Sequence, residues 1–269
     1  MTFADADDEY DESEFVIAGV PLEATVSFRR GTAFGPRRIR EASYGFEPYL
    51  PRHGVGLDEI GVHDYGDLDV WNSPEEVVGF SADVIEGFVN DGKTPVLIGG
   101  EHTVSLAGVR ATQPDVFVSI DAHLDLKDEF EGSRYSHACV TRRTLEEGID
   151  AVVVGARAGS RQEYRRADAD DVTVVTADGF SVESVEEALE GYDRPYISVD
   201  LDAVDPGYAP GVGTPEPYGL EPREVRDVVE HVASDAVGFD VVEACPSHGS
   251  GEASLLGAKL LRGFVGASV

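Results

Sequence analysis

The sequence predicts an α/β protein, a three-layer α/β/α sandwich around a mostly parallel central sheet. Short runs rich in Val and Ile alternate along the chain with longer stretches of helical character. Several of these runs are almost entirely apolar, as expected of strands that are buried on both faces. Strands that alternate with helices pair in parallel, because each helix carries the chain back to the starting edge of the sheet.

The individual elements follow from these two patterns. The expected strands are residues 15–20, 95–98, 116–120, 151–154, 172–176, 196–199 and 237–242. The expected helices are residues 36–44, 74–90, 103–112, 136–147, 160–166, 182–190, 222–233 and 251–265. Pro74 and Pro222 suit the first turn of their helices, because proline lacks the N–H that is unpaired there.

The chain is expected to form a single domain over residues 1–269. It has no internal repeat and no Pro/Gly/Ser-rich linker between two halves. Its first 14 residues are acidic, and residues 4–14 contain so few apolar side chains that we expect a partly disordered tail. The N-terminus lacks the basic start and apolar stretch of a secretory signal, and no apolar run reaches the ~18 residues of a membrane span. These features favour a soluble, cytoplasmic protein.

The charge of the chain is strongly negative. It has 52 acidic and 21 basic side chains, for a net charge of −31. Binding to nucleic acid through phosphates needs basic patches, so this class of partner is excluded. The acids suit a solvated surface like that of proteins from salt-loving organisms, and they would also attract a cationic substrate. Cys139 and Cys245 are too few for a disulfide scaffold, so we expect buried free thiols.

Three clusters of metal-binding side chains each follow an apolar run. They are His102 in Gly99-Gly100-Glu101-His102, the run Asp121-Ala122-His123-Leu124-Asp125, and the pair Asp200 and Asp202. In extended chain, alternate side chains share a face, so the ligands of the second cluster can point into one cavity, as can the pair Asp200 and Asp202. In parallel sheets, the binding crevice lies beyond the carboxyl ends of the strands. All three clusters follow such ends, so we expect them to lie together. Four carboxylates and two imidazoles suit two divalent cations, manganese rather than a thiolate-loving metal.

On these motifs the chain resembles the ureohydrolases, the family of arginases, agmatinases and their relatives. The similar segments are spread over nearly the whole chain. They are residues 19–21, residues 31–40, the three metal clusters, residues 198–206 and residues 210–217. Glu101 stands where the family usually has Asp. The resemblance implies an arginase-like fold and a homo-oligomer, a trimer or hexamer.

The resemblance also implies a role for each ligand. Two Mn²⁺ ions would be bound per chain, bridged by Asp121 and Asp200, with His102 and Asp125 on one ion and His123 and Asp202 on the other. A bridging hydroxide would attack the guanidinium carbon, and the tetrahedral intermediate would collapse to urea and an amine. Asp125 would pass a proton to the departing amine.

Two further residues match catalytic positions of the family. Glu243 follows the run 237–242 and matches the acid that pairs with the substrate guanidinium, a bidentate match for a flat fork of N–H donors. His137 matches a histidine that shuttles protons or contacts substrate, a task that suits an imidazole.

The substrate implied by the resemblance is a small cationic guanidino compound, most simply agmatine, which would give putrescine and urea. No loop resembles the one with which arginases hold the α-carboxylate and α-amino groups of arginine. Arg142 and Arg143 could hold a substrate carboxylate, as in a guanidinobutyrase, or pair with surface acids. Arginase and formimidoglutamase activities, a deacetylase-like metallohydrolase and a non-catalytic binding protein are the alternatives. Ala138, Tyr218 and the segment after Pro246 depart from the family pattern near the expected pocket.

Overall fold

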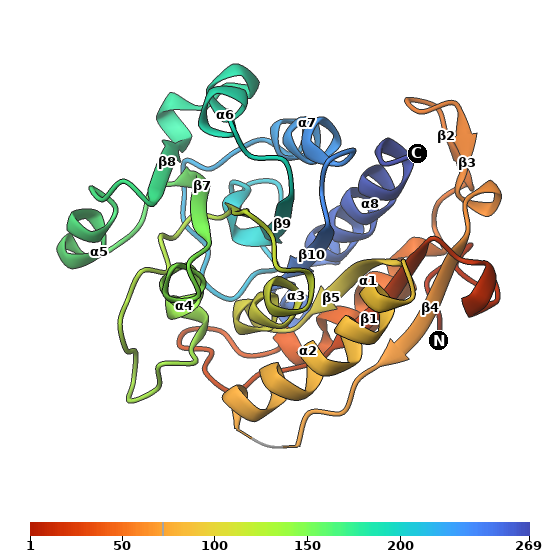
Figure 1. The fold of residues 1–269 in the computed structure, drawn as a ribbon, viewed down its shortest axis with the longest axis horizontal. Helices are drawn as coiled ribbons and strands as arrows, with labels where there is room; N and C mark the ends of the chain where they lie inside the picture. Colours follow the sequence, from red (N-terminus) through yellow and green to blue (C-terminus); the bar gives the residue numbers. More distant parts are fainter. Residues whose placement is uncertain (72) are drawn as a thin grey trace.

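The computed structural model describes residues 1–71 and 73–269, which are built around an eight-stranded sheet (Figure 1). Its strands are β1 (Phe15–Val20), β4 (Val62–Asp67), β5 (Thr94–Gly99), β6 (Val116–Ile120), β7 (Asp150–Ala156), β8 (Val172–Thr176), β9 (Pro195–Asp200) and β10 (Gly238–Val242). They lie in the order β4-β1-β5-β10-β9-β6-β7-β8. All neighbouring pairs are parallel, so the predicted sheet type is confirmed.

Helices cover both faces of the sheet and complete the predicted three layers (Figure 1). They are α1 (Gly35–Ser43), α2 (Pro74–Asn90), α3 (Ser105–Thr112), α4 (Val140–Glu146), α5 (Arg161–Arg166), α6 (Val182–Ala188), α7 (Pro222–Val232) and α8 (Glu252–Ala267). Helices α2, α3 and α4 share one core cluster with the strands, and α1, α6, α7 and α8 share the other. Within the described residues, no helix combines the length and the apolar composition that crossing a bilayer requires.

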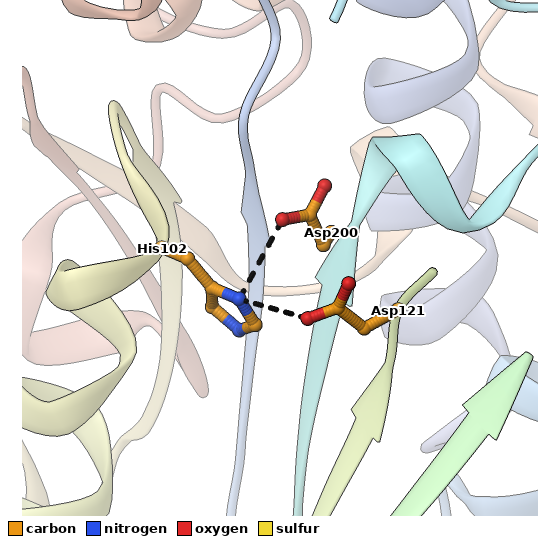
Figure 2. A group of neighbouring side chains, drawn as sticks. All are labelled: His102, Asp121 and Asp200. Carbon is orange, nitrogen blue, oxygen red and sulfur yellow. Dashed lines mark ion pairs between the residues drawn. The ribbon is translucent and has the colours of Figure 1, made fainter. Parts of the chain in front are cut away.

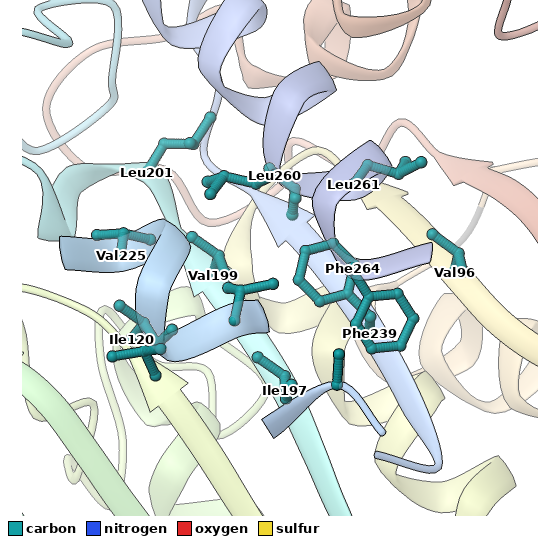
Figure 3. Close-up of a cluster of buried hydrophobic side chains, with 14 of the residues drawn as sticks. Val96, Ile120, Ile197, Val199, Leu201, Val225, Phe239, Leu260, Leu261 and Phe264 are labelled. Atoms are coloured by element: carbon teal, nitrogen blue, oxygen red, sulfur yellow. The ribbon is translucent and has the colours of Figure 1, made fainter. Parts of the chain in front are cut away.

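Alternate residues of the same strands contribute to the two core clusters. Leu97 of β5 packs in the cluster beneath α2 and α3, whereas its neighbour Val96 packs in the cluster beneath α1, α7 and α8. In that second cluster, Figure 3 shows Phe239 of β10 against Phe264 of α8, with ring centroids 4.6 Å apart. Burial on both faces fixes the register of each strand, because a slip by one residue would exchange the two faces.

Two features of the sheet region differ from the sequence prediction. Strand β4 was not expected, because its run Val-His-Asp-Tyr-Gly-Asp lacks the apolar character of the other strands. In the structure only Val62 and Asp64 of this strand are buried. Strands β2 (Tyr49–Leu50) and β3 (Val55–Gly56) form a short antiparallel hairpin that was also missed. Edge elements of this kind depend on tertiary contacts more than on local pattern. One such contact is the buried pair of Arg40 and Asp64, whose Nε–Oδ2 distance is 2.7 Å.

The acidic N-terminal segment, for which a partly disordered tail was predicted, packs against the edge of the sheet in the structure. Phe3 and Ala6 are both 1% exposed. The backbone N–H of Phe3 donates to Asp64 (2.6 Å), and the N–H of Asp64 donates to the carbonyl of Ala6 (3.0 Å). Two buried apolar side chains and this pairing along β4 hold the segment despite its charge.

Candidate metal centre

Four neighbouring strands present acidic or imidazole side chains at the same edge of the sheet. In the order β5-β10-β9-β6, the chain reaches His102 shortly after β5, Glu243 directly after β10, Asp200 at the end of β9 and Asp121 directly after β6. Parallel pairing aligns their carboxyl ends, so residues more than a hundred positions apart in sequence come together.

His102 is the centre of the first group of ligands. Its Nδ1 lies 3.1 Å from Asp121 Oδ2, 3.0 Å from Asp125 Oδ2 and 3.5 Å from Asp200 Oδ2. Figure 2 shows His102, Asp121 and Asp200 converging from three separate strand ends. All four side chains are buried.

A second group shares Asp121 with the first. His123 Nδ1 lies 3.1 Å from Asp202 Oδ2 and 3.5 Å from Asp121 Oδ1. The possible ligand atoms of Asp121, His123 and Asp202 lie within 4.8 Å of one another, as do those of His102, Asp121 and Asp200. The structure thus brings all six predicted ligands into two adjoining groups with a common carboxylate.

The donor set fits divalent cations. His102 Nδ1 and Asp121 Oδ2 are buried and have no hydrogen-bond partner among the described residues, although such atoms are ordinarily satisfied. Burial, together with the neighbouring Asp202, Asp121 and Glu243 carboxylates, raises the pKa of Asp200 well above its usual range. Burial and Asp121 raise the pKa of Asp125 to about 6. So many buried carboxylates need positive charge to ionise together, and two dications would supply it.

The imidazole of His102 is fixed from behind by a chain of buried polar groups. Its Nε2 lies 3.1 Å from Ser198 Oγ, the Ser198 hydroxyl donates to Asp240 (2.7 Å), and the Tyr196 hydroxyl donates to the same carboxylate (2.9 Å). This chain favours the tautomer whose Nδ1 lone pair faces the site. Gly108 of α3 leaves room for the Tyr196 hydroxyl, which would lie 1.9 Å from a Cβ at that position.

The loop that carries Asp202 is held by Arg157 instead. Arg157 lies just beyond β7 and donates to five backbone carbonyls, those of Gly155, Asp202, Ala203, Glu216 and Pro217 (2.7–3.3 Å). The Thr214 hydroxyl donates to Asp202 Oδ2 (2.8 Å). The guanidinium therefore joins the two ends of the 201–220 loop, and Thr214 joins the loop to the ligand.

Glu243 is buried beside the ligands. Its Oε1 accepts the backbone N–H of His102 (3.0 Å), and its own N–H donates to the carbonyl of Gly100 (2.8 Å). Gly100 is required there, because a Cβ would lie 2.1 Å from the carbonyl oxygen of Leu22. Burial raises the pKa of Glu243 to about 8. A buried carboxyl of this kind binds a cation strongly, since the cation supplies the charge that the site lacks.

His137 lies at the other side of the site, against a loop that precedes α1. Its Nδ1 is 3.2 Å from Thr25 Oγ1, and its Nε2 is 3.4 Å from Ser27 Oγ. Glu101 holds this loop by accepting the backbone N–H groups of Ala24 (2.6 Å) and Thr25 (2.7 Å). Burial, with His102 and His123 nearby, lowers the pKa of His137 to about 4, so the ring is neutral at neutral pH.

Three residues near the site adopt left-handed backbone conformations that favour glycine. Asp125 has φ +49°, Glu243 has φ +63° and Tyr218 has φ +66°. Strained backbone at a site must be held by the surrounding structure. Asp125 therefore reaches His102 from a left-handed backbone conformation and not through the extended alternation predicted for residues 121–125. Tyr218 has a backbone conformation that glycine adopts more readily, and its side chain is 85% exposed.

The remaining predicted residues lie outside the two ligand groups. Arg142 pairs with Glu146 (3.3 Å), and Arg143 pairs with Asp128 (3.2 Å) and Glu146 (3.1 Å), so both arginines take the surface-acid alternative. Cys139 and Cys245 are buried free thiols.

Sequence reasoning missed Arg157, Ser198 and Asp240. Ser198 and Asp240 are polar residues inside apolar strand runs, which is a usable signal for a buried polar chain. Arg157 gave no such signal, because its partners are backbone carbonyls.

Comparison with known proteins places the chain in a family. A family model described as "Arginase family" matches residues 13–266. The agmatinase of Pyrococcus horikoshii is 32% identical over 262 residues, 96% of this chain and 93% of that protein. The N(1)-aminopropylagmatine ureohydrolase of Thermus thermophilus is 35% identical over 278 residues, 99% of this chain and 94% of that protein. The crystal structure of agmatine ureohydrolase of Thermoplasma volcanium superposes with a TM-score of 0.94 at 38% identity, covering 99% and 94% of the two chains. The resemblance inferred from the motifs is confirmed.

Proposed function

Because this chain belongs to the arginase family and is a hydrolase of amidine C–N bonds, we propose that it cleaves agmatine to putrescine and urea. The observation that carries the proposal is the buried Glu243 carboxylate beside two adjoining ligand groups. A planar guanidinium pairs with a carboxylate through two parallel N–H bonds. Its carbon would then lie over the ligand groups, where the reaction needs it.

Two Mn²⁺ ions are the proposed cofactors, supported by the oxygen-rich donor set. One ion would be held by His102, Asp121, Asp125 and Asp200. The other would be held by His123 and Asp202 together with the shared Asp121 and Asp200. When bound, such ions lower the pKa of water so that a nucleophile is available at neutral pH.

The protein's own side chains perform the other steps. Glu243 binds and orients the guanidinium, which leaves the carbon open to attack from the ligand side. The Asp125 carboxylate, which lies beside His102, takes the proton of the attacking water and returns it to the departing amine nitrogen. His137 is neutral at the rim between Thr25 and Ser27, and it can contact the bound substrate there through a hydrogen bond.

The single-domain organisation, the cytoplasmic location and the homo-oligomeric state remain proposals of the same kind. They rest on the absence of a linker in the sequence, on the composition and on the family resemblance. Size-exclusion chromatography with light scattering, in high and low salt, tests the trimer or hexamer.

A second candidate substrate is N(1)-aminopropylagmatine, because relatives named for it are as similar to this chain as the agmatinases are. Both compounds present a guanidinium to the same site and differ in what extends from the distal amine. The distal amine of either compound would extend toward the outer edge of the site, where the Glu216 side chain is 42% exposed.

One urea-release assay tests the proposal. Protein loaded with Mn²⁺ is offered agmatine, N(1)-aminopropylagmatine, arginine, 4-guanidinobutyrate and formiminoglutamate, in low and high salt. We expect the first two to be turned over fastest. Turnover of a carboxylated compound without turnover of agmatine contradicts the substrate, and two bound metals without any urea contradict the reaction.

A further inference from the structure

We propose that Glu216 recognises the second cationic group of the substrate, the amine at the far end from the guanidinium. This inference rests on the proposed function, because it requires a guanidinium bound at Glu243. It makes Glu216 the residue that selects dicationic over neutral or carboxylated guanidino compounds.

Glu216 ends a short segment that runs along the site. At Gly213, a Cβ would lie 2.7 Å from Glu243 Oε2, so the chain there passes against the acid proposed to bind the guanidinium. At Thr214, the hydroxyl donates to Asp202 (2.8 Å). At Glu216, Oε1 lies 3.9 Å from His123 Nε2 on the ring edge that faces away from Asp202. The segment therefore leads from the guanidinium end of the site to its outer edge.

The length of this path matches the substrate. Three Cα steps separate Gly213 from Glu216, and each step spans at most ~3.8 Å, so the path covers up to roughly 11 Å. An extended four-carbon diamine arm places its distal nitrogen roughly 7 Å from the guanidinium carbon by ordinary bond lengths. The hydrogen bonds of an ammonium to a carboxylate add ~3 Å. A substrate held at Glu243 is therefore long enough to extend along this segment toward Glu216.

The carboxylate of Glu216 is available for this contact. Among the described residues it forms no ion pair with a lysine or arginine, and its contact with His123 is too long for a hydrogen bond. Its backbone is held nonetheless, since Arg157 donates to the Glu216 carbonyl through Nη2 (2.7 Å) and to the Pro217 carbonyl through Nε (3.1 Å). An anchored backbone that carries a carboxylate with no hydrogen bond among the described residues is pre-organised for a cation.

The competing interpretation is that Glu216 only orients His123. Ligating histidines commonly donate their second ring N–H to a carboxylate, and loss of that partner weakens metal binding. The two roles predict different results, because an orienting residue affects every substrate alike whereas a recognition residue affects only substrates with the distal charge.

The test compares Glu216→Gln with the wild type on agmatine and on pentylguanidine, in which a methyl replaces the distal ammonium. We expect kcat/KM for agmatine to fall roughly 10- to 100-fold through KM, the loss of one charged hydrogen bond. For pentylguanidine we expect less than a twofold change, and Mn²⁺ affinity should be unchanged by calorimetry. Glu187→Gln, an exposed glutamate on α6, is the matched control and should change neither value.

Each outcome decides the inference. Equal losses for both substrates with weaker Mn²⁺ binding would assign Glu216 to His123 and overturn recognition, and an unchanged KM for agmatine would also overturn it. If the wild type releases no urea, the proposed function fails. In that case the Kd values of agmatine and pentylguanidine for both Mn²⁺-loaded proteins provide the same comparison, and recognition fails if Glu216→Gln leaves their ratio unaltered.

Discussion

The two halves of the metal centre contain the same ligand types on very different supports. The half around His102 is built on the ends of central strands, and the imidazole is 1% exposed. The half around His123 is built on loops, and its imidazole is 26% exposed. Behind His102 stands a chain of side chains inside the core, whereas the loop of Asp202 is held by one guanidinium through backbone carbonyls.

This difference indicates that the two halves have unequal affinity for metal. A ligand whose rotamer is locked by packing and a buried hydrogen bond loses little freedom on binding an ion. A ligand on a loop must be ordered at the same time, and local opening of the loop competes with binding. We therefore expect the His102 half to fill first and the His123 half to lose its ion first.

Removing the charge of Asp121, the carboxylate that both halves contact, should weaken metal binding in both halves. Asp121→Asn replaces a charged ligand that contacts both imidazoles, at 3.1 Å and 3.5 Å, by a neutral amide. We expect activity to fall on the order of 1,000-fold or more, because an activated water contributes several kcal/mol. Metal counting after dialysis should show fewer than two ions per chain. Asp168→Asn, an exposed aspartate, is the control, and two retained ions in Asp121→Asn would contradict the shared-ligand geometry.

Ser198→Ala should weaken the His102 half selectively. It cuts the link between His102 Nε2 and Asp240, leaving the ring without its hydrogen-bond partner. Losses of up to about 100-fold in metal affinity are typical for such partners. Calorimetric titration with Mn²⁺ should show that the affinity of the tighter of the two binding steps falls toward the affinity of the weaker step.

The neighbouring strand supplies a matched control for this prediction. Ser119 of β6 pairs in register with Ser198, is fully buried, and its hydroxyl has no hydrogen-bond partner among the described residues. Ser119→Ala should therefore leave both binding steps unchanged. If the two variants behave alike, the effect is one of strand packing, and the polar chain is not what distinguishes the halves.

The convergence of the proposed ligands at one edge of the sheet could be predicted from the sequence, but the groups that support them could not. His102, Asp121 and Asp200 follow apolar runs, and parallel pairing of such runs necessarily brings their ends to one edge. The order of those strands could not be predicted. It places Glu243 between His102 and Asp200, and it depends on crossover connections that local periodicity does not encode.

Loop structure marks the limit of the sequence prediction. Arg157 was not singled out, because five carbonyl partners spread over a 63-residue stretch leave no residue pattern to recognise. The left-handed conformation of Asp125 was missed for a related reason, since alternating acids and histidine predict extended chain. The acidic segment around Phe3 and Ala6 was expected to be partly disordered, because its composition says nothing of the edge strand it packs against.

Arg157→Lys is the mildest test of the half around His123, which is built on loops. A lysine keeps the charge but loses the planar fork, so it can reach only some of the five carbonyls. We expect the weaker Mn²⁺ step to lose about 10-fold in affinity, at the lower end for residues that orient ligands, while the tighter step is unchanged. Hydrogen exchange of residues 201–220 should become faster.

The control is Arg161→Lys at the exposed start of α5, which should alter neither exchange nor metal binding. If Arg157→Lys weakened both Mn²⁺ steps equally, the two halves would form one cooperative unit and the contrast between them would be wrong. If exchange accelerated with no change in affinity, the loop would be held by Arg157 for stability alone, and the position of Asp202 would have to come from Thr214, whose hydroxyl contacts it directly.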